Sequence, residues 1–315
     1  MDKEYSVAEA KAICPHQSAL SNFIARFLAK QASECTRRAY KSDLKIFFEE
    51  LQIRDPEEIL PDHILSYRNR LSERLRPATI ARKLTVIRQF FGFCVDLDLL
   101  SKNPADKIKA PKVDHLSTTN GLSKEEAEEF LRQPDRSTLR GKRDFAMLFL
   151  MINNGLRRSE VTAIRWGDFG QERGYSILMI RGKGAQEDIT KIKPSVMEAI
   201  EAYKEASGRA FGKDTPLFIT SRTKGGEPSE RAEKPLSPET IRVMVKKNAA
   251  LAQIKKRVSP HSLRHTCITL CLDGGGSIRQ AQYLARHGDP RTTMRYDRNR
   301  NNLDDHGTDY VQLRP

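Results

Sequence analysis

Few features of the sequence suit a secreted, disulfide-bonded or membrane-embedded protein. The five cysteines are odd in number and form no CxxC pair, so we expect reduced thiols and no disulfide framework. The longest apolar run, Phe145–Ile152, is far too short to cross a bilayer. The opening residues MDKEYS are charged and lack the apolar centre of a signal peptide. We therefore expect a soluble, cytoplasmic protein with no membrane partner.

Motifs for nucleotide and metal chemistry are also missing. The sequence has no GxxxxGK[ST] phosphate loop, and no cluster of carboxylates accompanies its basic motifs, as a metal nuclease would require. Two pairs of candidate zinc ligands have i,i+4 spacing: His261 with His265, and Cys267 with Cys271. On one helix, however, the cysteines point about 200° away from the direction of His265, so the four cannot meet at one zinc ion. We expect neither a metal nor another cofactor.

The chain carries a large excess of positive charge. Its 315 residues are enough for two domains with separate cores. The formal net charge is +14 and the isoelectric point is near 9.6, which favours a polyanionic partner, nucleic acid before membrane. Residues 1–115 carry 20 Lys and Arg against 16 Asp and Glu, so most of the excess lies in residues 116–315.

Apolar residues recur at helical spacing through the first hundred residues. They predict helices that begin near four residues, namely Ser18, Thr36 as a cap, Asp62 and Pro77. Four helices with short connections form a compact bundle, which we place at residues 16–102 after a leader at residues 1–15.

Hydroxyl and basic side chains on the second and fourth of these helices are candidate contacts to nucleic-acid phosphates. For each of them an ordinary solvated helix face is at least as good an interpretation. The candidates are Thr36, Arg37, Arg38, Lys41, Thr79 and Arg82. We expect Arg82, Lys83 and Arg88 to remain accessible beside the buried face of the fourth helix.

A second domain follows a segment without periodicity. Residues 103–121 contain two prolines and several lysines, which is typical of an interdomain linker. Ser123 and Glu126 then form a capping box for a helix, and Lys142–Asn154 predicts a buried one. We place the second domain at residues 122–302 and a short tail at residues 303–315.

Basic residues of the second domain lie in defined local structure. Arg157 and Glu160 are i,i+3 neighbours on a predicted helix, so the carboxylate can hold the guanidinium. Tyr175–Arg181 and Asp188–Ile192 read as two strands of a hairpin. Lys183 lies at its glycine-flanked tip, where it can reach a neighbouring groove or remain an ordinary surface lysine.

The last helices carry further candidate groups. His261 and Arg264 lie about 60° apart on a helix that starts at a proline, whereas Leu263 falls on the opposite, buried side. We therefore expect an exposed row of proton-transfer and phosphate-binding groups, followed along the chain by His287 and Tyr296. An ordinary basic helix is the simpler interpretation of any one of these residues alone.

Taken together, these residues resemble the tyrosine recombinase (phage integrase) family. The matching motifs are Asn-Gly-Leu-Arg157-Arg-Ser-Glu160, Arg181-Gly-Lys183-Gly, His261-Ser-Leu-Arg264-His-Thr, and His287 with Tyr296 nine residues later. Each motif is weak alone, but the ordered set is specific and covers roughly residues 123–297. The helical bundle resembles the core-binding domain of the family. One departure is Arg286, because the family usually has glycine before this histidine.

The resemblance implies a mainly α fold with a small β-sheet, in which a helical-bundle core-binding domain precedes a mixed α+β catalytic domain. It implies an enzyme that cuts and rejoins specific sites in double-stranded DNA through a 3′-phosphotyrosyl intermediate, without metal or ATP. The implied assembly is a dimer on each site and a tetramer in the synapse, in the cytoplasm at the nucleoid. We expect no arm-binding domain, and a self-sufficient recombinase of a mobile element.

The chemistry gives each matched residue a role. The implied catalytic residues are Arg157, Lys183, His261, Arg264, His287 and Tyr296, supported by Glu160. Phosphodiester cleavage without metal requires charge on the non-bridging oxygens, which arginine forks provide. The phenol fits the nucleophile and the hairpin lysine fits the acid for the leaving 5′-oxygen. The imidazoles can accept the tyrosine proton or bond the phosphate, and the glutamate orients the first arginine.

Two other functions use many of the same residues. A type IB topoisomerase shares the chemistry but relaxes DNA as a monomer, and the paired domains with the His–Tyr spacing favour recombination instead. A DNA-binding regulator with a decayed site would have lost at least one member of the set by chance. The set is complete, so we favour a recombinase over both.

Overall fold

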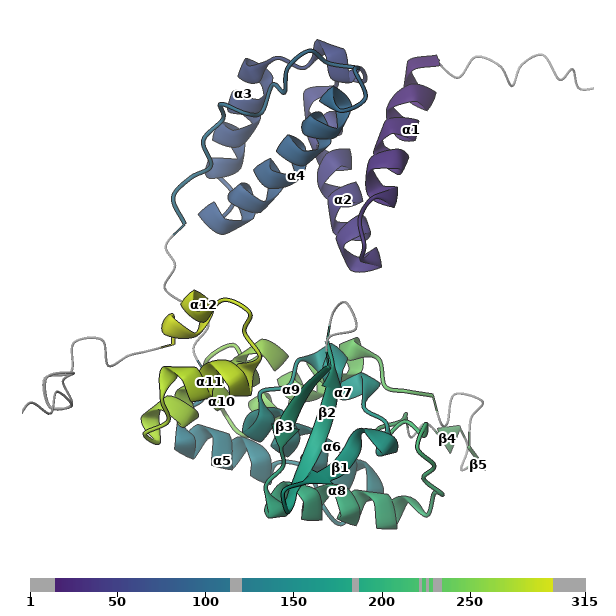
Figure 1. The fold of residues 1–315 in the computed structure, drawn as a ribbon, viewed down its shortest axis with the longest axis vertical. Coiled ribbons are helices and arrows are strands. Elements are labelled where there is room, and N and C mark those ends of the chain that lie inside the picture. The colour runs from purple at the N-terminus through teal and green to yellow at the C-terminus, as the bar shows by residue number, and fades with distance from the viewer. Residues whose placement is uncertain are drawn as a thin grey trace, which may run out of the picture. The chain divides into compact units, whose positions relative to one another are not determined.

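The computed structural model describes residues 15–113, 121–182, 187–220, 223–224, 227–228 and 234–296. The chain divides into two compact units, Met1–His115 and Leu116–Pro315, and each is described by itself (Figure 1). Three predicted features lie outside the described residues: the leader up to residue 14, Lys183 and the tail at residues 303–315. In the described ranges no helix has the length and apolarity needed to span a membrane.

Within residues 15–113, the first unit consists of four α-helices and a short 3-10 turn. The elements are α1 (Pro15–Ala29), α2 (Glu34–Leu51), η2 (Pro56–Glu58), α3 (Pro61–Ser72) and α4 (Pro77–Val95). The four predicted helices are therefore confirmed. Ser33, and not Thr36, caps α2, because its hydroxyl accepts a hydrogen bond from the Thr36 N–H at 3.2 Å.

Aromatic side chains fill the core of this unit. Phe47, Phe90 and Phe91 are fully buried, and their rings meet at steep angles with centroids 5.5–6.2 Å apart in the pairs Phe47–Phe91 and Phe90–Phe91. Such edge-to-face pairs add to the burial of large apolar surfaces. The core explains why α2 and α4 pack closely, although α4 begins 26 residues after α2 ends.

The basic residues of α4 are less available than predicted. Asp43 of α2 is buried and pairs with both Arg82 and Lys83, the latter at 2.9 Å. Arg88 donates to the Ile108 carbonyl at 2.8 Å. Lys83 is 8% exposed, so the expectation that it stays accessible is wrong: a buried carboxylate needs a partner charge, and Lys83 supplies it.

The chain beyond α4 packs back on the same unit. Ala105 and Ile108 are buried in its core, and the Asn103 side chain donates to the Arg88 carbonyl at 3.0 Å. These residues belong to the predicted linker 103–121, of which residues 114–120 lie outside the described part. The domain boundaries drawn from the sequence stay a prediction.

The second unit is mixed. Its helices are α5 (Lys124–Arg132), α6 (Leu139–Asn154), α7 (Arg158–Ala163), α8 (Pro194–Ser207), α9 (Pro238–Leu251), α10 (Pro260–Asp273), α11 (Ile278–Ala285) and α12 (Pro290–Met294), with the 3-10 turn η3 (Trp166–Asp168). Its strands are β1 (Phe169–Glu172), β2 (Tyr175–Arg181), β3 (Glu187–Lys191), β4 (Thr223–Lys224) and β5 (Glu227–Pro228). The predicted fold class, mainly α with a small sheet, is confirmed.

The main sheet is antiparallel in the order β1-β2-β3, with Leu178 opposite both Phe169 and Thr190 (Figure 1). Alternate residues of β2, Leu178 and Ile180, point into the core that α6 and α8 share. The Asn154 side chain at the end of α6 donates to the Thr190 hydroxyl and the Lys191 carbonyl, at 3.0 and 2.8 Å. This joins the hairpin to the turn that follows α6.

Helix α10 is buried on nearly every side. All residues from 262 to 269 are buried, because α6, α9 and α11 all contact this helix. Leu263 has no exposed surface, as predicted, but Arg264 is only 2% exposed. The expected exposed row is therefore wrong for Arg264, and only His261 in the first turn is exposed. Arg264 reaches its neighbours from inside the protein.

Candidate active site

The turn after α6 places Arg157. Gly155 ends α6 in the left-handed region, at φ 58°, and Arg157 is the N-cap of α7. Glu160 accepts the backbone N–H of Arg157 at 2.7 Å and its Nη1 at 2.5 Å, so the predicted ion pair is confirmed. The Arg157 side chain is 47% exposed and that of Glu160 only 7%. A buried carboxylate thus holds a guanidinium whose outer edge is open to a ligand.

The Arg264 side chain connects the end of α6 to the end of α11. Its Nη1 donates to the Gly155 carbonyl at 2.5 Å, and its Nη2 donates to the Ala285 carbonyl. Each Nη carries two hydrogens, so both atoms keep a donor for a bound anion. Burial, with the charges of Arg157 and Arg286, lowers the pKa of Arg264 to about 10, which leaves it charged at neutral pH.

The imidazoles of His261 and His287 are uncharged at neutral pH. Burial, followed by the charges of Arg264 and Arg157, lowers the pKa of His287 to about 4. Partial burial and the same two arginines lower the pKa of His261. The Nδ1 atom of His287 lies 2.9 Å from the Thr293 hydroxyl of α12, which fixes the ring. Neutral imidazoles among cations can accept a proton.

Tyr296 lies two residues after the end of α12 and is 7% exposed. Its ring meets that of His265 edge-on, with centroids 4.5 Å apart, and stacks on His287 at 6.0 Å. Burial raises the pKa of the Tyr296 phenol, and the charge of Arg264 acts in the opposite direction. The phenol is therefore protonated at neutral pH and requires a base before it can act as a nucleophile.

The cluster has more cations than anions. Among the described residues of the cluster, the guanidinium groups of Arg157, Arg264 and Arg286 lie around one carboxylate, that of Glu160. Since both imidazoles are neutral, the cluster carries an excess of about two positive charges in a largely buried place. Burial raises the pKa of Glu160, but Arg286 and then Arg157 outweigh it and hold it below its ordinary value. Such a site favours a dianionic or diester phosphate ligand.

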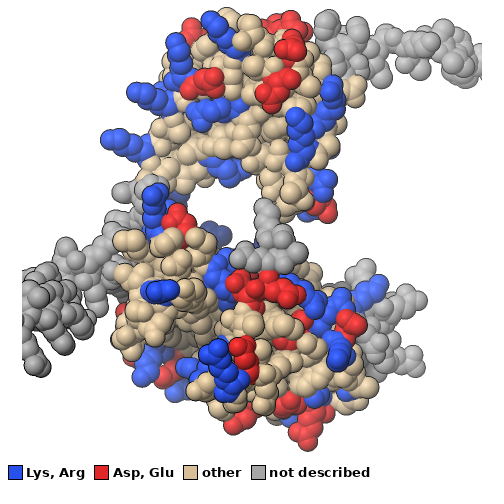
Figure 2. Space-filling model, in the orientation of Figure 1, with Lys and Arg blue, Asp and Glu red and all other residues tan. Residues whose placement is uncertain are grey.

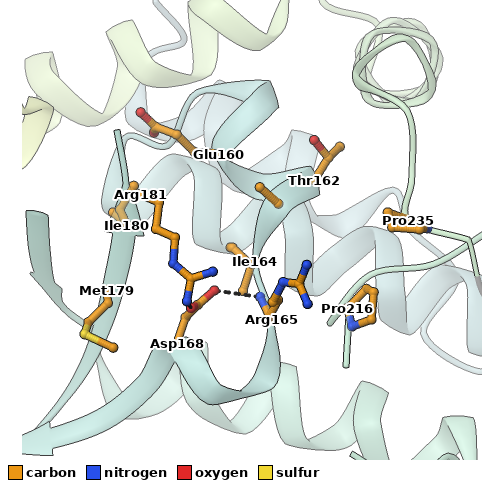
Figure 3. Close-up of a pocket in the computed structure, with 11 residues that line it drawn as sticks. Glu160, Thr162, Ile164, Arg165, Asp168, Met179, Ile180, Arg181, Pro216 and Pro235 are labelled. Atoms are coloured by element: carbon orange, nitrogen blue, oxygen red, sulfur yellow. Dashed lines mark hydrogen bonds and ion pairs between the residues drawn. The ribbon is translucent and has the colours of Figure 1, made fainter. Parts of the chain in front are cut away.

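A small cavity lies on the other side of Glu160. It has a volume of about 240 Å³ and is lined in part by Arg165, Asp168 and Arg181. Figure 3 shows the Glu160 carboxylate pointing away from Arg181, whose guanidinium reaches Asp168 at 3.0 Å. Asp168 also accepts the backbone N–H of Arg165 at 2.7 Å. Arg181 is the last residue of β2, so this ion pair anchors the base of the hairpin that carries Lys183.

The structure brings five of the six predicted catalytic residues into one cluster. They are Arg157, His261, Arg264, His287 and Tyr296, with Glu160 beside them. Lys183 lies outside the described residues. Sequence reasoning did not assign His265, Arg286 or Thr293 to the site. The sequence holds a signal for Arg286 alone, because it replaces the glycine that the family usually has.

The six predicted DNA contacts of the first unit lie on two helices. Thr36, Arg37, Arg38 and Lys41 are on α2, and Thr79 and Arg82 are on α4. Arg37, Arg38, Lys41 and Arg82 are all exposed, but Arg38 pairs with Glu34 at 2.9 Å and Arg82 pairs with Asp43. Figure 2 shows Lys and Arg side chains spread over the visible face of each unit, with Asp and Glu among them.

Two parts of the chain match known families. Residues 120–302 match the Phage integrase family, and residues 21–96 match the Phage integrase, N-terminal SAM-like domain. A tyrosine recombinase of Synechococcus elongatus is 31% identical over 327 aligned residues, covering 99% of this chain and 98% of that protein. Tyrosine recombinase XerC of Thermodesulfovibrio yellowstonii is 28% identical, covering 88% and 90%.

Solved recombinase structures share the fold. XerH site-specific recombinase, bound to a palindromic difH substrate in a post-cleavage complex, has a TM-score of 0.70 at 18% identity, covering 89% of this chain and 80% of that chain. A lambda integrase dimer bound to a COC′ core site has a TM-score of 0.68 at 16% identity, covering 87% and 95%. At these identities the likeness shows the fold alone.

The helical first unit, the mixed second unit and the arginine–histidine–tyrosine cluster define a class of DNA strand-exchange enzymes. The family match covers more than half of the chain, and the Synechococcus relative covers nearly all of it. The chain belongs to the phage integrase family and is a tyrosine-type site-specific recombinase.

Proposed function

We propose that this cluster cleaves and rejoins double-stranded DNA at a specific site, with Tyr296 as the nucleophile. The observation that carries the proposal is the excess of buried positive charge beside a protonated phenol and two neutral imidazoles. Arg157 and Arg264 bind the non-bridging oxygens of the scissile phosphate. Their charge stabilises the transition state, where negative charge gathers on those oxygens.

The proton transfers follow from the protonation states. Tyr296 loses its proton to a neutral imidazole, His261 or His287, as its oxygen attacks the phosphorus. The bond to the 5′-oxygen breaks, and Lys183 gives that oxygen a proton. The product is a 3′-phosphotyrosyl ester and a free 5′-hydroxyl. The phosphotyrosyl ester conserves the energy of the cleaved phosphodiester bond. A 5′-hydroxyl from a second duplex can therefore reverse the steps without ATP.

The proposal includes the DNA contacts and the assembly. Exposed Arg37 and Lys41, with Thr36, Arg38, Thr79 and Arg82, contact phosphates of the bound site. Among the solved relatives are lambda integrase dimers on a core site and a tetramer on a Holliday junction. By this likeness we propose a dimer on each site and a tetramer in the synapse. The expected place of action is the cytoplasm, at the nucleoid, in the service of a mobile element.

Strand exchange distinguishes this function from DNA relaxation. Nicked duplexes of random sequence are first incubated with the protein in the presence of a chelator. The sequences of the duplexes that become covalently attached identify the target site. Two differently labelled copies of that site should then exchange strands and give recombinant products. Relaxation of supercoiled DNA without any recombinant product would support the topoisomerase alternative instead.

A further inference from the structure

Arg286 adopts a backbone conformation that suits glycine better than arginine. It is the C-cap of α11, with φ 51° and ψ 51°, in the left-handed region. Glycine usually occupies this position in the family that the sequence resembles. A non-glycine residue is strained there, and strain of this kind persists where the surrounding contacts compensate for it. The side chain supplies those contacts.

The Arg286 guanidinium is buried, and both of its Nη atoms donate hydrogen bonds. Its Nη2 donates to Glu160 Oε2 at 2.9 Å and to the Gly155 carbonyl at 3.2 Å. Its Nη1 donates to the carbonyls of Leu284 and Asn154, at 2.9 and 3.2 Å. The side chain is 4% exposed, so these contacts are made inside the protein.

These contacts join the two segments that carry proposed catalytic groups. Asn154 and Gly155 form the turn that leads to Arg157, and Glu160 holds the Arg157 guanidinium with its other oxygen. On the other side, Arg286 directly precedes His287 in the chain. The planar guanidinium group donates to several acceptors at fixed angles, which the ammonium group of a lysine cannot do.

We propose that Arg286 is a positioning residue that acts through Glu160. It holds the carboxylate so that Arg157 faces the scissile phosphate, and it fixes the Asn154–Gly155 turn to the end of α11. The inference rests on the proposed role of Arg157 in phosphate binding. In this chain the Arg286 side chain aligns the two turns, at a position where glycine would make no side-chain contact.

The chain offers a matched control for the test. Arg173, in the turn between β1 and β2, has φ 50° and is exposed. Arg173→Gly and Arg286→Gly therefore remove the same charge and relieve the same kind of backbone strain. Only the second removes the contact with Glu160. Single-turnover cleavage and the Kd for half-site DNA are measured for both, using the site recovered by covalent attachment.

We expect Arg286→Gly to slow cleavage on the order of 10- to 100-fold, as a small displacement of a catalytic group does. Its Kd should stay within about threefold of the wild type, because the remaining phosphate contacts set affinity. Arg173→Gly should match the wild type in both. Arg286→Lys should recover part of the rate, since its ammonium still neutralises Glu160 but cannot bond all the carbonyls.

A double-mutant cycle separates positioning from a general structural effect. In a Glu160→Gln background, Arg286→Gly should cost less than about threefold, because the contact is already weakened. Equal rates for Arg286→Gly and the wild type, or full multiplicative costs in the cycle, would overturn the proposal. If Arg286→Gly does not fold, Arg286→Lys and Arg173→Lys are compared in the same cycle with the same criteria. Failure of the wild type to form a covalent complex would instead overturn the proposed function.

Discussion

The two candidate phosphate-binding arginines differ in their surroundings. Arg157 has an open edge and is held from one side by Glu160, whereas Arg264 is buried and bonded to the carbonyls of Gly155 and Ala285. Arg264 thus has a second task, to hold the ends of two helices together. Removing a buried charged donor leaves its acceptor unsatisfied, at a cost of roughly 1–3 kcal/mol.

Replacement by lysine should reveal this difference. We expect Arg157→Lys and Arg264→Lys each to slow single-turnover cleavage by roughly two orders of magnitude, because a point charge cannot replace the fork. Arg264→Lys should also lower the melting temperature, whereas Arg157→Lys should leave it nearly unchanged. Thermal unfolding of both variants checks this. A normal cleavage rate in either variant would mean that its arginine is only structural.

At the scale of elements, the β2–β3 hairpin carries the proposed acid. The Arg181–Asp168 pair and the Asn154 bonds to β3 fix its base, and Lys183 follows β2 by two residues in the sequence, outside the described part of the chain. A 5′-bridging sulfur leaves as a thiolate and needs no proton. We therefore expect Lys183→Ala to be defective on normal DNA and close to the wild type on the 5′-thio substrate. An equal defect on both substrates would remove Lys183 from the acid role.

Helices and turns were the most predictable elements. Repeated apolar spacing and the capping pair Ser123 and Glu126 predict helices that the structure confirms. Strand β1 was not predicted, because its four residues, FGQE, have no alternation and depend on pairing with β2. Local patterns report on one element at a time, so they miss structure that a neighbouring strand stabilises.

The burial of α10 on several sides also could not be predicted from the sequence. Periodicity gave α10 one buried face, but its burial depends on α6, α9 and α11 together. The contacts of Arg286 to Asn154 and Glu160 likewise span more than 120 residues of chain. The order and identity of the candidate residues could be predicted by resemblance, whereas these long-range contacts required the structure.

At the scale of the whole molecule, residues 303–315 are the candidate link between protomers. This segment lies outside the described residues, and its sequence includes Tyr310, Val311 and Leu313. If this segment packs on a neighbouring protomer, truncation after Asn302 should spare binding of one protomer to a half-site. It should abolish both cooperative binding to the full site and recombination. Gel-shift titrations on both DNAs check this. Unchanged cooperativity with intact recombination would mean that the tail does not act between protomers.

Cleavage by the proposed mechanism depends above all on Tyr296 as the nucleophile. The most direct measurement is covalent attachment to nicked DNA in chelator, with the wild type compared with Tyr296→Phe. Phe keeps the ring contacts with His265 and His287 and removes only the oxygen. We predict a detergent-stable protein–DNA complex for the wild type and none for Tyr296→Phe, with nearly equal Kd values. A covalent complex formed by Tyr296→Phe would contradict the account.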